Sequence, residues 1–591
     1  MYEYRAPRRD FAFVIHEVLE AERVFAGLGR EELTRELIDG IVDEAARFAE
    51  SVLSPLNWQG DWNPPVLDHG QVRTPPGFKE AYRQFCRDGW AGMSADPAYG
   101  GQGLPALAQI AVGEMLCSAA MAWRMASGLS EGAVQAVARH GSEALKKQYL
   151  EKLVKGEWTG TMCLTEPQAG TDLSILRTRA EPQADGSLKV SGTKIFISWG
   201  EHDMVDNIVH LVLARLPDAL PGTKGISLVL VPKFIDGAPN GVSCVSIENK
   251  MGIHGSPTCV LAFDGARGWL IGNPGGGLAC MFTMMNHARL GVGLQGLGLS
   301  ERALQAAVSY AFERLQGRGA HGPVARDKNA DPIVVHADVR RMLLTLKALT
   351  EGQRLLCYYT YSLLDTEHLT SDAAERERVG QLVALLVPIV KAFLTDTAME
   401  TTGLGVQVHG GSGFVRDTGA EQFLRDAKIA CIYEGTNGIQ ALDLLGRKVL
   451  GTGGASVKLL VEEIGKTLAL DIPESLQPYA AKLGAALAEW GALTRLVGER
   501  VATEAEELGA AAADYLAQAG YVCVAWCWLR MALVANRALA AGGADGAFYE
   551  GKLAAARFYF ERLLPRASAH ASAVRAGAAT LPLLSKEHFS G

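Results

Sequence analysis

Two short runs in the middle of the chain, Leu188-Lys-Val-Ser191 and Thr193-Lys-Ile-Phe-Ile-Ser198, decide the class of fold, because they begin a region rich in β-branched and aromatic residues. Three more apolar runs of strand length follow, at 208–213, 226–231 and 259–263. The turn signals in this region are Asp-Gly pairs at 185–186, 236–237 and 264–265. The pattern predicts an all-β domain of about 110 residues.

Helical periodicity lies on both sides of this β domain. From Glu31 to about Lys155, apolar residues recur at three- and four-residue spacing, with loops expected at 58–76 and 98–105. The periodicity returns from Gly277 to about Leu450, and a glycine-rich linker leads to an Ala- and Leu-rich tail. We predict a mainly α protein with a central β domain: an N-terminal helical domain (1–160), a middle β domain (161–275), a C-terminal helical bundle (276–450) and an additional helical domain (457–591). Strands and helices do not alternate, which excludes a doubly wound fold.

The composition is that of an ordinary globular protein. The net charge of −8 argues against general attraction to nucleic acid or to anionic membranes. The first ten residues lack the apolar stretch of a secretory signal, so we expect a cytoplasmic protein. The most apolar run, Tyr521 to Leu529, stops at Arg530, short of the roughly 20 residues that a spanning helix needs, and we expect no membrane span.

Several familiar motifs are missing or occur in the wrong context. Gly291-Val-Gly-Leu-Gln-Gly296 matches the dinucleotide fingerprint, but it sits inside a helical stretch with no preceding strand, so we interpret its glycines as sites of close helix packing. Gly410-Gly-Ser-Gly-Phe414 fails the nucleophile-elbow pattern at its last position, which disfavours serine hydrolysis. No HExxH, paired CxxC or EF-hand loop is found, so a metal centre has no support.

Three polar segments stand out. Met162 to Ser174 presents hydroxyls and backbone amides where the β domain begins, and Gln407 to Phe414 has three glycines in four residues between helices. In the segment Ala430 to Lys448, Glu434 follows an apolar Cys-Ile-Tyr run, and partial burial would raise its pKa and make it a better base. Each also has an ordinary explanation: a surface connection, an interhelix turn, and an acid in the first turn of a helix.

Together these segments resemble the acyl-CoA dehydrogenase family. The specific motifs are Leu164-Thr-Glu-Pro-Gln-Ala-Gly-Thr-Asp172, Gln407 to Phe414, and Ile432-Tyr-Glu-Gly-Thr436, and the resemblance covers roughly residues 30–450. It implies an N-terminal helical domain, a middle β-barrel and a C-terminal helical bundle. The continuation Asn437 to Lys448 and the C-terminal extension resemble a longer bacterial branch of the family.

The resemblance implies a reaction and a role for Glu434. An acyl-CoA thioester would be dehydrogenated to the trans-2-enoyl-CoA, as in fatty-acid β-oxidation, with Glu434 removing the α-proton and N5 of FAD accepting the β-hydride. The Glu434 N–H and a flavin ribityl hydroxyl would stabilise the developing enolate. Some relatives place the base on an earlier helix, at the position of Ala288 here, which cannot act as a base.

The resemblance also nominates binding residues. Arg314 and Gln316 would reach the FAD of a neighbouring subunit. Three positions depart from the family pattern: Phe196 and Ser198 stand where Trp-x-Thr is usual, and Gly438 where many relatives have Gln. For substrate we expect Asn286, Arg289 and Gly435, although a surface ion pair explains Arg289 equally well. The FAD contacts expected in full are Leu164, Thr165, Thr171, Phe196, Ser198, Arg314, Gln316, Gln407, Gly410, Gly411, Thr436 and Gly438.

The implied partners are an acyl-CoA substrate, an electron-transfer flavoprotein and a second copy of the chain. Residues 451–591 carry 13 Lys and Arg against 14 Asp and Glu, so this nearly neutral tail lacks the basic excess of a DNA-associated relative. Its apolar helices favour a homodimer, with a tetramer as the alternative. An acyl-CoA oxidase and a non-catalytic nucleic-acid-binding or scaffold protein remain alternatives. Acyl length, branching and a thioether group stay open.

Overall fold

The computed structural model describes residues 3–542 and 544–590, which form two compact units. One unit contains residues 3–6 and 44–291, and the other contains residues 7–43 and 292–590. The boundaries fall inside helices α3 (Arg35–Phe48) and α8 (Gly277–Glu313). We describe each unit by itself.

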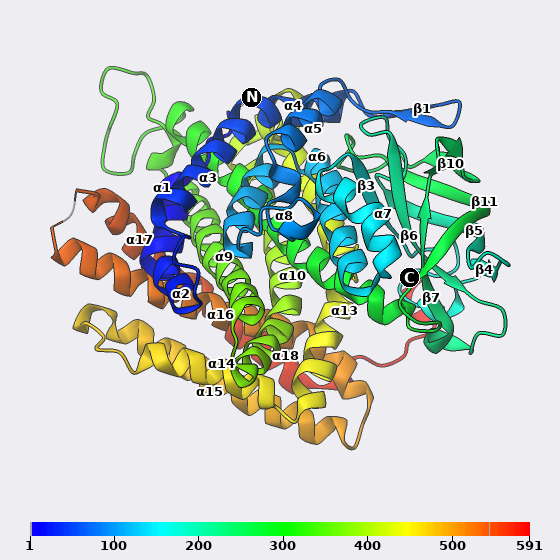
Figure 1. Cartoon of the computed structure of the whole chain (residues 1–591). Helices are drawn as coiled ribbons and strands as arrows, with labels where there is room; N and C mark the ends of the chain where they lie inside the picture. The colour runs from blue at the N-terminus through cyan, green and yellow to red at the C-terminus, as the bar shows by residue number, and fades with distance from the viewer. Residues whose placement is uncertain (1–2, 543, 591) are drawn as a thin grey trace. The chain divides into compact units, whose positions relative to one another are not determined.

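The unit of residues 44–291 holds the β domain, a seven-stranded sheet that closes on itself (Figure 1). The strand order is β10-β11-β5-β4-β6-β3, and β7 joins β6 to β11. Because this pairing leads from β6 through β7 back to β11, the strands form a barrel, as predicted. Buried apolar side chains such as Val190, Val212, Val229 and Leu261 form its core. The strands are β3 (Trp158–Cys163), β4 (Arg179–Pro182), β5 (Leu188–Ser198), β6 (Asn207–Arg215), β7 (Ile226–Pro232), β10 (Val242–Ile247) and β11 (Thr258–Ile271).

The Asp-Gly pairs have different outcomes. Asp236-Gly237 makes the expected turn, joining β8 (Phe234–Ile235) to β9 (Ala238–Pro239), and both of its residues have positive φ. The turn predicted at Asp264-Gly265 was wrong, because β11 continues through it. The register shifts there, from Asp264 opposite Ser191 to Ala266 opposite Val190, so Gly265 occupies a β-bulge at φ +64°.

Helices α4 (Ser54–Trp62), α5 (Phe78–Arg87), α6 (Ala106–His140) and α7 (Glu143–Val154) belong to the same unit. The loop predicted at 58–76 was partly wrong: its first residues complete α4, and β1 (Val66–Asp68) then pairs with β2 (Gln71–Arg73). The loop expected at 98–105 was correct apart from a single 3₁₀ turn at Pro97–Tyr99. Its Gly101 is required, because a Cβ there would lie 2.1 Å from the Ala95 carbonyl oxygen.

The other unit is helical. Its bundle contains the part of α8 from residue 292 onward, α9 (Ala337–Leu369), α10 (Ala373–His409), α12 (Ala420–Lys428) and α13 (Asn437–Leu442). Two of the three fingerprint-like glycines, Gly293 and Gly296, pack helices as interpreted above, whereas a Cβ on Gly291 would meet nothing within 4 Å. A Cβ on Gly293 would lie 2.8 Å from Val390 Cγ1, and one on Gly296 would lie 3.0 Å from the Leu394 carbonyl oxygen, both on α10.

The tail packs directly on this bundle. It consists of α14 (Ala455–Leu468), α15 (Gln477–Val501), α16 (Glu506–Ala540), α17 (Gly546–Phe558) and α18 (Arg566–Ala576). Trp528 on α16 is fully buried and donates to the Ala348 carbonyl of α9 at 2.8 Å. A Cβ on Gly520 would meet the Phe393 ring of α10 at 2.2 Å. Helix α16 therefore covers the bundle in close contact.

Three helices, α6, α10 and α16, are long and apolar enough to cross a membrane by length and composition. The apolar run Tyr521 to Leu529, which the sequence analysis singled out, is only part of α16. Their apolar windows are buried inside the protein by 89%, 83% and 67%, respectively. Packing against neighbouring elements accounts for this hydrophobicity.

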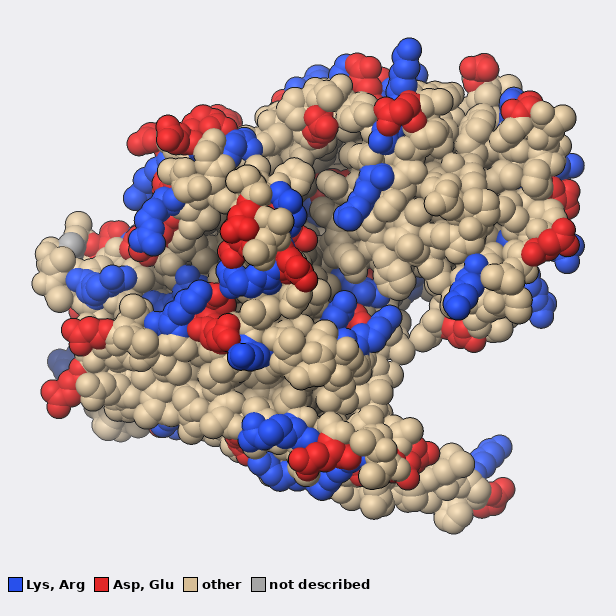
Figure 2. Space-filling view, turned by 60° about the horizontal axis from the view of Figure 1, so that its bottom comes forward, with Lys and Arg blue, Asp and Glu red and all other residues tan. Residues whose placement is uncertain are grey.

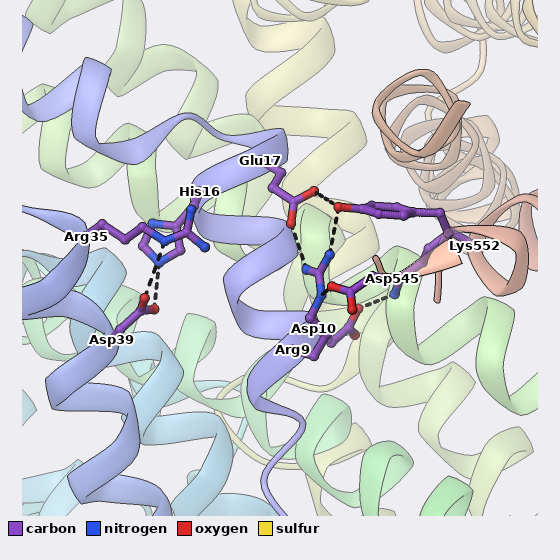
Figure 3. A network of polar contacts seen from close by, with 9 residues as sticks. Arg9, Asp10, His16, Glu17, Arg35, Asp39, Asp545 and Lys552 are labelled. Carbon is purple, nitrogen blue, oxygen red and sulfur yellow. Dashed lines mark hydrogen bonds and ion pairs between the residues drawn. The ribbon is translucent and has the colours of Figure 1, made fainter. Parts of the chain in front are cut away.

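An N-terminal arm, residues 7–18, joins the tail to the bundle, and Figure 3 shows its contacts with the tail. It comprises α1 (Arg8–Ala12) and a π-helical turn (Phe13–Val18). Arg9 donates to Asp545 at 2.9 Å and to the Tyr549 hydroxyl at 2.8 Å, both beside or on α17. Buried Asp10 accepts from Lys552 on α17 and from Arg354 on α9. Burial raises the pKa of Asp10, but these two cations outweigh it and hold the pKa well below its usual range.

Candidate functional site

The loop that follows β3 contains the first predicted flavin motif, and a buried ion pair organises it. Lys194 and Glu166 are both nearly inaccessible to solvent, with Nζ and Oε1 2.8 Å apart. Lys194 also donates to the Leu164 carbonyl at 2.9 Å, and Glu166 accepts from the Arg177 and Thr178 amides at 2.6 and 3.0 Å. Burial raises the pKa of Glu166, but the attraction of Lys194 and these hydrogen bonds lower it to about 2.

The end of β5 lies beside this loop. The Ile195 amide donates to the Thr165 carbonyl at 2.9 Å, which brings the two predicted flavin segments together. Between its pairings with Leu261 and Cys259, β5 has an extra residue, and Phe196 at this bulge has φ +59° and is 58% exposed. The exposed Phe196 thus follows the residue that bonds to Thr165 and precedes Ser198 by two positions on β5, and both Thr165 and Ser198 are half-buried. Thr171 lies farther along the loop and is exposed.

The predicted substrate residues of α8 are one turn apart. Arg289 Nη1 lies 3.5 Å from Asn286 Oδ1, and its guanidinium is 5.6 Å from the centre of the Phe282 ring. Arg289 is only 6% exposed. The alternative interpretation of Arg289 as a surface ion pair was therefore wrong, because the residue is not at the surface. A buried, permanently charged guanidinium suits a polar or anionic ligand group.

Glu434 lies in a short loop between a 3₁₀ turn (Ile429–Cys431) and α13. It is half-buried, and its φ of +57° is rare for a residue with a side chain. Gly435 follows at φ +83°. Because Thr436 is the N-cap of α13, Glu434 stands two residues outside the helix, and the alternative of a first-turn acid was wrong. Strained backbone of this kind persists only where the surroundings hold it.

Contacts on both sides fix the Glu434 loop. The Tyr433 hydroxyl donates to Gln295 on α8. The Gln440 side chain donates to the carbonyls of Glu434 and Gly435 at 3.3 and 3.5 Å. At Gly438, where many relatives have Gln, an added Cβ would meet only the Thr436 hydroxyl at 3.9 Å. Lack of space therefore does not explain why this position is a glycine.

Arg314 and Gln316 begin a long loop, residues 314–332, that folds around one carboxylate. The Gln316 amide donates to the Asp331 carbonyl at 3.0 Å, and the Ile333 amide donates to the Arg314 carbonyl at 2.8 Å, which closes the loop at its base. Buried Asp331 accepts from three loop amides, those of Gly319, Val324 and Ala325, at 2.9, 3.0 and 2.7 Å. The Gly319 amide contributes most to lowering the pKa of Asp331, to about 2.

The predicted glycine segment lies at the end of α10. Gln407 is in its last turn, Gly410 leaves the helix with φ +60°, and Gly411 begins a four-residue helix, α11 (Gly411–Phe414). A Cβ at either glycine would meet nothing within 4 Å. Open space beside exposed backbone suits the approach of a phosphate.

The structure thus places the predicted residues in local groups within each unit. Leu164, Thr165, Thr171, Phe196, Ser198, Asn286 and Arg289 belong to the unit of residues 44–291, and Arg314, Gln316, Gln407, Gly410, Gly411, Glu434, Gly435, Thr436 and Gly438 belong to the other. Sequence reasoning missed Lys194, Asp331 and Asn437, which support these groups. Only Lys194 had a usable signal, since strand alternation places it on the same face as Leu188 and Val190.

Models of protein families match most of the chain. Residues 38–157, 161–266 and 275–450 match the N-terminal, middle and C-terminal domains of acyl-CoA dehydrogenase, and residues 460–584 match a domain described as acetyl-CoA dehydrogenase C-terminal like. The N-terminal arm precedes all four matches.

Full-length relatives and a solved structure agree with these matches. The chain is 42% identical to 3-methylmercaptopropionyl-CoA dehydrogenase of Ruegeria pomeroyi, over 97% of this chain and 98% of the relative. It is 34% identical to a butyryl-CoA dehydrogenase of Syntrophomonas wolfei, over 95% of each. An acyl-CoA dehydrogenase from Bacillus anthracis, solved with FAD, has the same fold, with a TM-score of 0.74 and 21% identity over 92% of this chain and 88% of that one.

Proposed function

Because the chain belongs to the acyl-CoA dehydrogenase family, we propose that it dehydrogenates an acyl-CoA thioester to the trans-2-enoyl-CoA, with FAD as cofactor and Glu434 as the base. The observation that carries the assignment of the base is the Glu434 loop. It presents a half-buried carboxylate in a left-handed backbone conformation, outside any helix and fixed from both sides.

The residues present fit FAD. The segments joined by the bond from the Ile195 amide to Thr165 carry an exposed aromatic ring, Phe196, and two hydroxyls, Thr165 and Ser198, which are the apolar and hydrogen-bonding groups that an isoalloxazine requires. Gly410 and Gly411 leave room for phosphate oxygens to approach the backbone, and Arg314 supplies a cation for the pyrophosphate of a second copy. When bound, FAD accepts the β-hydrogen of the substrate together with its electron pair.

Glu434 performs the proton transfer. An α-proton of a thioester is too weak an acid to leave unaided, so its removal needs a positioned base and stabilisation of the enolate oxygen. The Glu434 carboxylate takes the proton, and its own N–H is proposed to donate to the thioester oxygen. Arg289 and Asn286 are proposed to bind polar groups of the substrate.

The proposed substrate is a short acyl-CoA. The similarity to a 3-methylmercaptopropionyl-CoA dehydrogenase and to a butyryl-CoA dehydrogenase supports acyl groups whose linear chain has four or five atoms, counting a thioether sulfur but not the carbonyl oxygen. Anaerobic titration with butyryl-CoA and 3-methylmercaptopropionyl-CoA, followed by loss of flavin absorbance, would rank the two. An equal response to long-chain acyl-CoA would contradict this preference.

We further propose an electron-transfer flavoprotein as acceptor, a cytoplasmic location and a homodimer. The relatives are named dehydrogenases, which favours this acceptor over the oxygen that an acyl-CoA oxidase would use. Stoichiometric oxygen consumption during turnover would instead establish an oxidase.

The close packing of the tail on its own bundle supports the dimer, because those helix faces are then closed to another subunit. A light-scattering mass of four subunits would contradict the dimer.

A nucleic-acid-binding function has weaker support. On the face shown in Figure 2, Lys and Arg side chains are interspersed with Asp and Glu instead of forming a basic stripe. Salt-sensitive DNA binding without substrate-dependent flavin bleaching would favour that alternative.

The assignment of the base is tested by Glu434→Gln, which keeps the shape of the side chain but removes its basicity. We expect flavin reduction by butyryl-CoA to slow at least about 10³-fold while FAD and acyl-CoA still bind. Glu377→Gln, at an exposed acid on α10, is the control and should behave as wild type. Native-rate flavin reduction by Glu434→Gln would show that another group is the base.

A further inference from the structure

The side chain of Asn437 connects the Glu434 loop to helix α10. Its Oδ1 accepts from Lys391 Nζ at 2.7 Å, and its Nδ2 donates to Asp396 Oδ1 at 2.7 Å and to Thr395 Oγ1 at 2.9 Å. The amide therefore contacts a cation, an anion and a hydroxyl on successive turns of a single helix. A donor and an acceptor on one short side chain are both needed for this arrangement.

The contact with Lys391 is strong for a physical reason. Lys391 is fully buried, and a buried ammonium needs hydrogen-bond acceptors to offset the loss of water. A hydrogen bond to a charged donor is shorter and about twice as strong as one between neutral groups. The start of α13 is therefore fixed by a hydrogen bond to a buried charge. Such a directional contact allows less movement than packing between apolar side chains.

Both ends of the loop meet α10 at the same place. Before Glu434, the Cys431 thiol lies 3.4 Å from the Thr395 carbonyl oxygen, and after Glu434, Asn437 contacts the Thr395 hydroxyl. Thr395 is itself fully buried. Between these two attachments stand the successive left-handed residues Glu434 and Gly435. The attachments thus prevent the strained segment from relaxing.

We propose that Asn437 is a positioning residue for the base. Held by Lys391 and Asp396, it keeps the Glu434 backbone in its left-handed conformation and so sets the directions of both the carboxylate and the N–H. This inference rests on the proposed function of Glu434. It assigns Asn437 an effect on the rate of proton removal and none on the affinity for FAD or acyl-CoA.

The first test is Asn437→Ser, because a serine side chain is too short to reach Lys391 and Asp396. We expect flavin reduction by saturating butyryl-CoA to slow by about 10- to 100-fold, since a displacement of about 1 Å can cost a factor of 100. FAD content and the dissociation constant of acyl-CoA should stay within about twofold of wild type. Glu377→Gln on the same helix is again the control.

The second test exchanges the partners. Asn437→Asp alone places two carboxylates side by side and should also be slow. Combining it with Asp396→Asn restores the pattern, because position 437 still accepts from Lys391 and the new amide at 396 donates to it. We expect the double variant to recover to within about threefold of the wild-type rate.

The outcomes separate this inference from the proposed function. Native-rate reduction by Asn437→Ser, slowing that matches lost FAD or lost folded protein, or failure of the exchange to recover activity would each overturn the role of Asn437. If Glu434→Gln is inactive while Asn437→Ser reduces flavin at the native rate, only the positioning role of Asn437 is contradicted. If Glu434→Gln reduces flavin at the native rate, the base assignment fails whatever Asn437 does.

Discussion

At the scale of single residues, Phe196 and Glu434 share an unusual backbone. Both adopt positive φ, a conformation that disfavours an L-residue by roughly 1–2 kcal/mol. Both also stand at positions that the sequence motifs nominate for the flavin and the base. A conformation of this kind orients a side chain in a way that relaxed backbone cannot, and we propose that the strain at these two positions serves the site.

A glycine at position 434 should relieve this strain and destroy the chemistry. We expect Glu434→Gly to be more stable than wild type by about 1 kcal/mol and to show no flavin reduction by butyryl-CoA. Chemical denaturation and anaerobic mixing measure the two effects. Glu434→Ala retains a Cβ and is the control, with no gain in stability. Equal stability of the Gly and Ala variants would contradict the strain argument.

The buried pair Lys194 and Glu166 makes a second prediction at this scale. Lys194→Met leaves the Glu166 carboxylate buried and unpaired, which should destabilise the unit of residues 44–291 by about 3–5 kcal/mol. The double variant Lys194→Met/Glu166→Leu removes both charges and should recover much of this loss. Denaturation monitored by flavin fluorescence would follow it. A double variant no more stable than the single one would contradict this account.

Residue identities were easier to predict than residue conformations. Motifs were sufficient to nominate Glu434 and Phe196, because the chemistry depends on residue type and order. Their positive φ values could not be predicted, since neither is a glycine and the strain is maintained by Gln295, Gln440 and Asn437, contacts that only the folded chain forms.

At the scale of elements, the loop 314–332 depends on one ionised side chain. Its carboxylate, Asp331, has a pKa lowered from 3.8 to about 2 by the Gly319 amide and other donors. Because the pKa is lower in the folded state, the stabilisation is complete above about pH 4 and is lost as pH falls toward 2. Protection of the Gly319, Val324 and Ala325 amides from hydrogen exchange should decrease over this range.

Asp331→Asn provides the control for this pH dependence. An amide can accept through one oxygen only. The variant can therefore still accept from Val324 and Ala325, which share one oxygen of Asp331, but should have low protection of the Gly319 amide at every pH. Wild type and variant should therefore differ at pH 6 and converge near pH 2. A difference that stays constant with pH would mean that the carboxylate charge is not what orders the loop.

The Asp-Gly pairs show what local sequence leaves undecided about elements. The same dipeptide makes a turn at 236–237 and a bulge at 264–265. Both structures need a residue with positive φ, so the sequence signal is the same. The difference comes from β5, whose residues Val190, Lys189 and Leu188 continue to pair with β11 beyond the bulge. This long-range pairing cannot be read from the dipeptide.

At the scale of the whole molecule, buried charges join the two ends of the chain within one unit. Asp10 in the N-terminal arm, Arg354 and Glu351 in α9, Glu301 in α8 and Lys552 in α17 form one network. All five are nearly inaccessible to solvent. No local pattern could predict this network, because its bonded partners are 53 to 542 residues apart and each looks like a surface charge in the sequence.

Removing one member should weaken the whole unit. Lys552→Met leaves Asp10 paired with Arg354 alone and Glu351 paired only with the partly exposed Lys347, and we expect destabilisation of about 3–5 kcal/mol. Thermal unfolding would measure it. Lys458→Met, at an exposed lysine of α14, is the matched control and should change stability little. A loss in Lys552→Met no larger than in this control would show that the network contributes nothing.

The distance between Asp10 and Lys552 along the chain has a consequence for synthesis. The two residues are 542 positions apart. At about 5–20 residues per second, a ribosome needs roughly 30 to 110 seconds to add the lysine after the aspartate. Throughout this interval the arm has no complete tail to bind, and the bundle, once synthesised, has no cover on the face that α16 contacts until α16 has been made. The arm can therefore complete its buried contacts only after α17 has been synthesised.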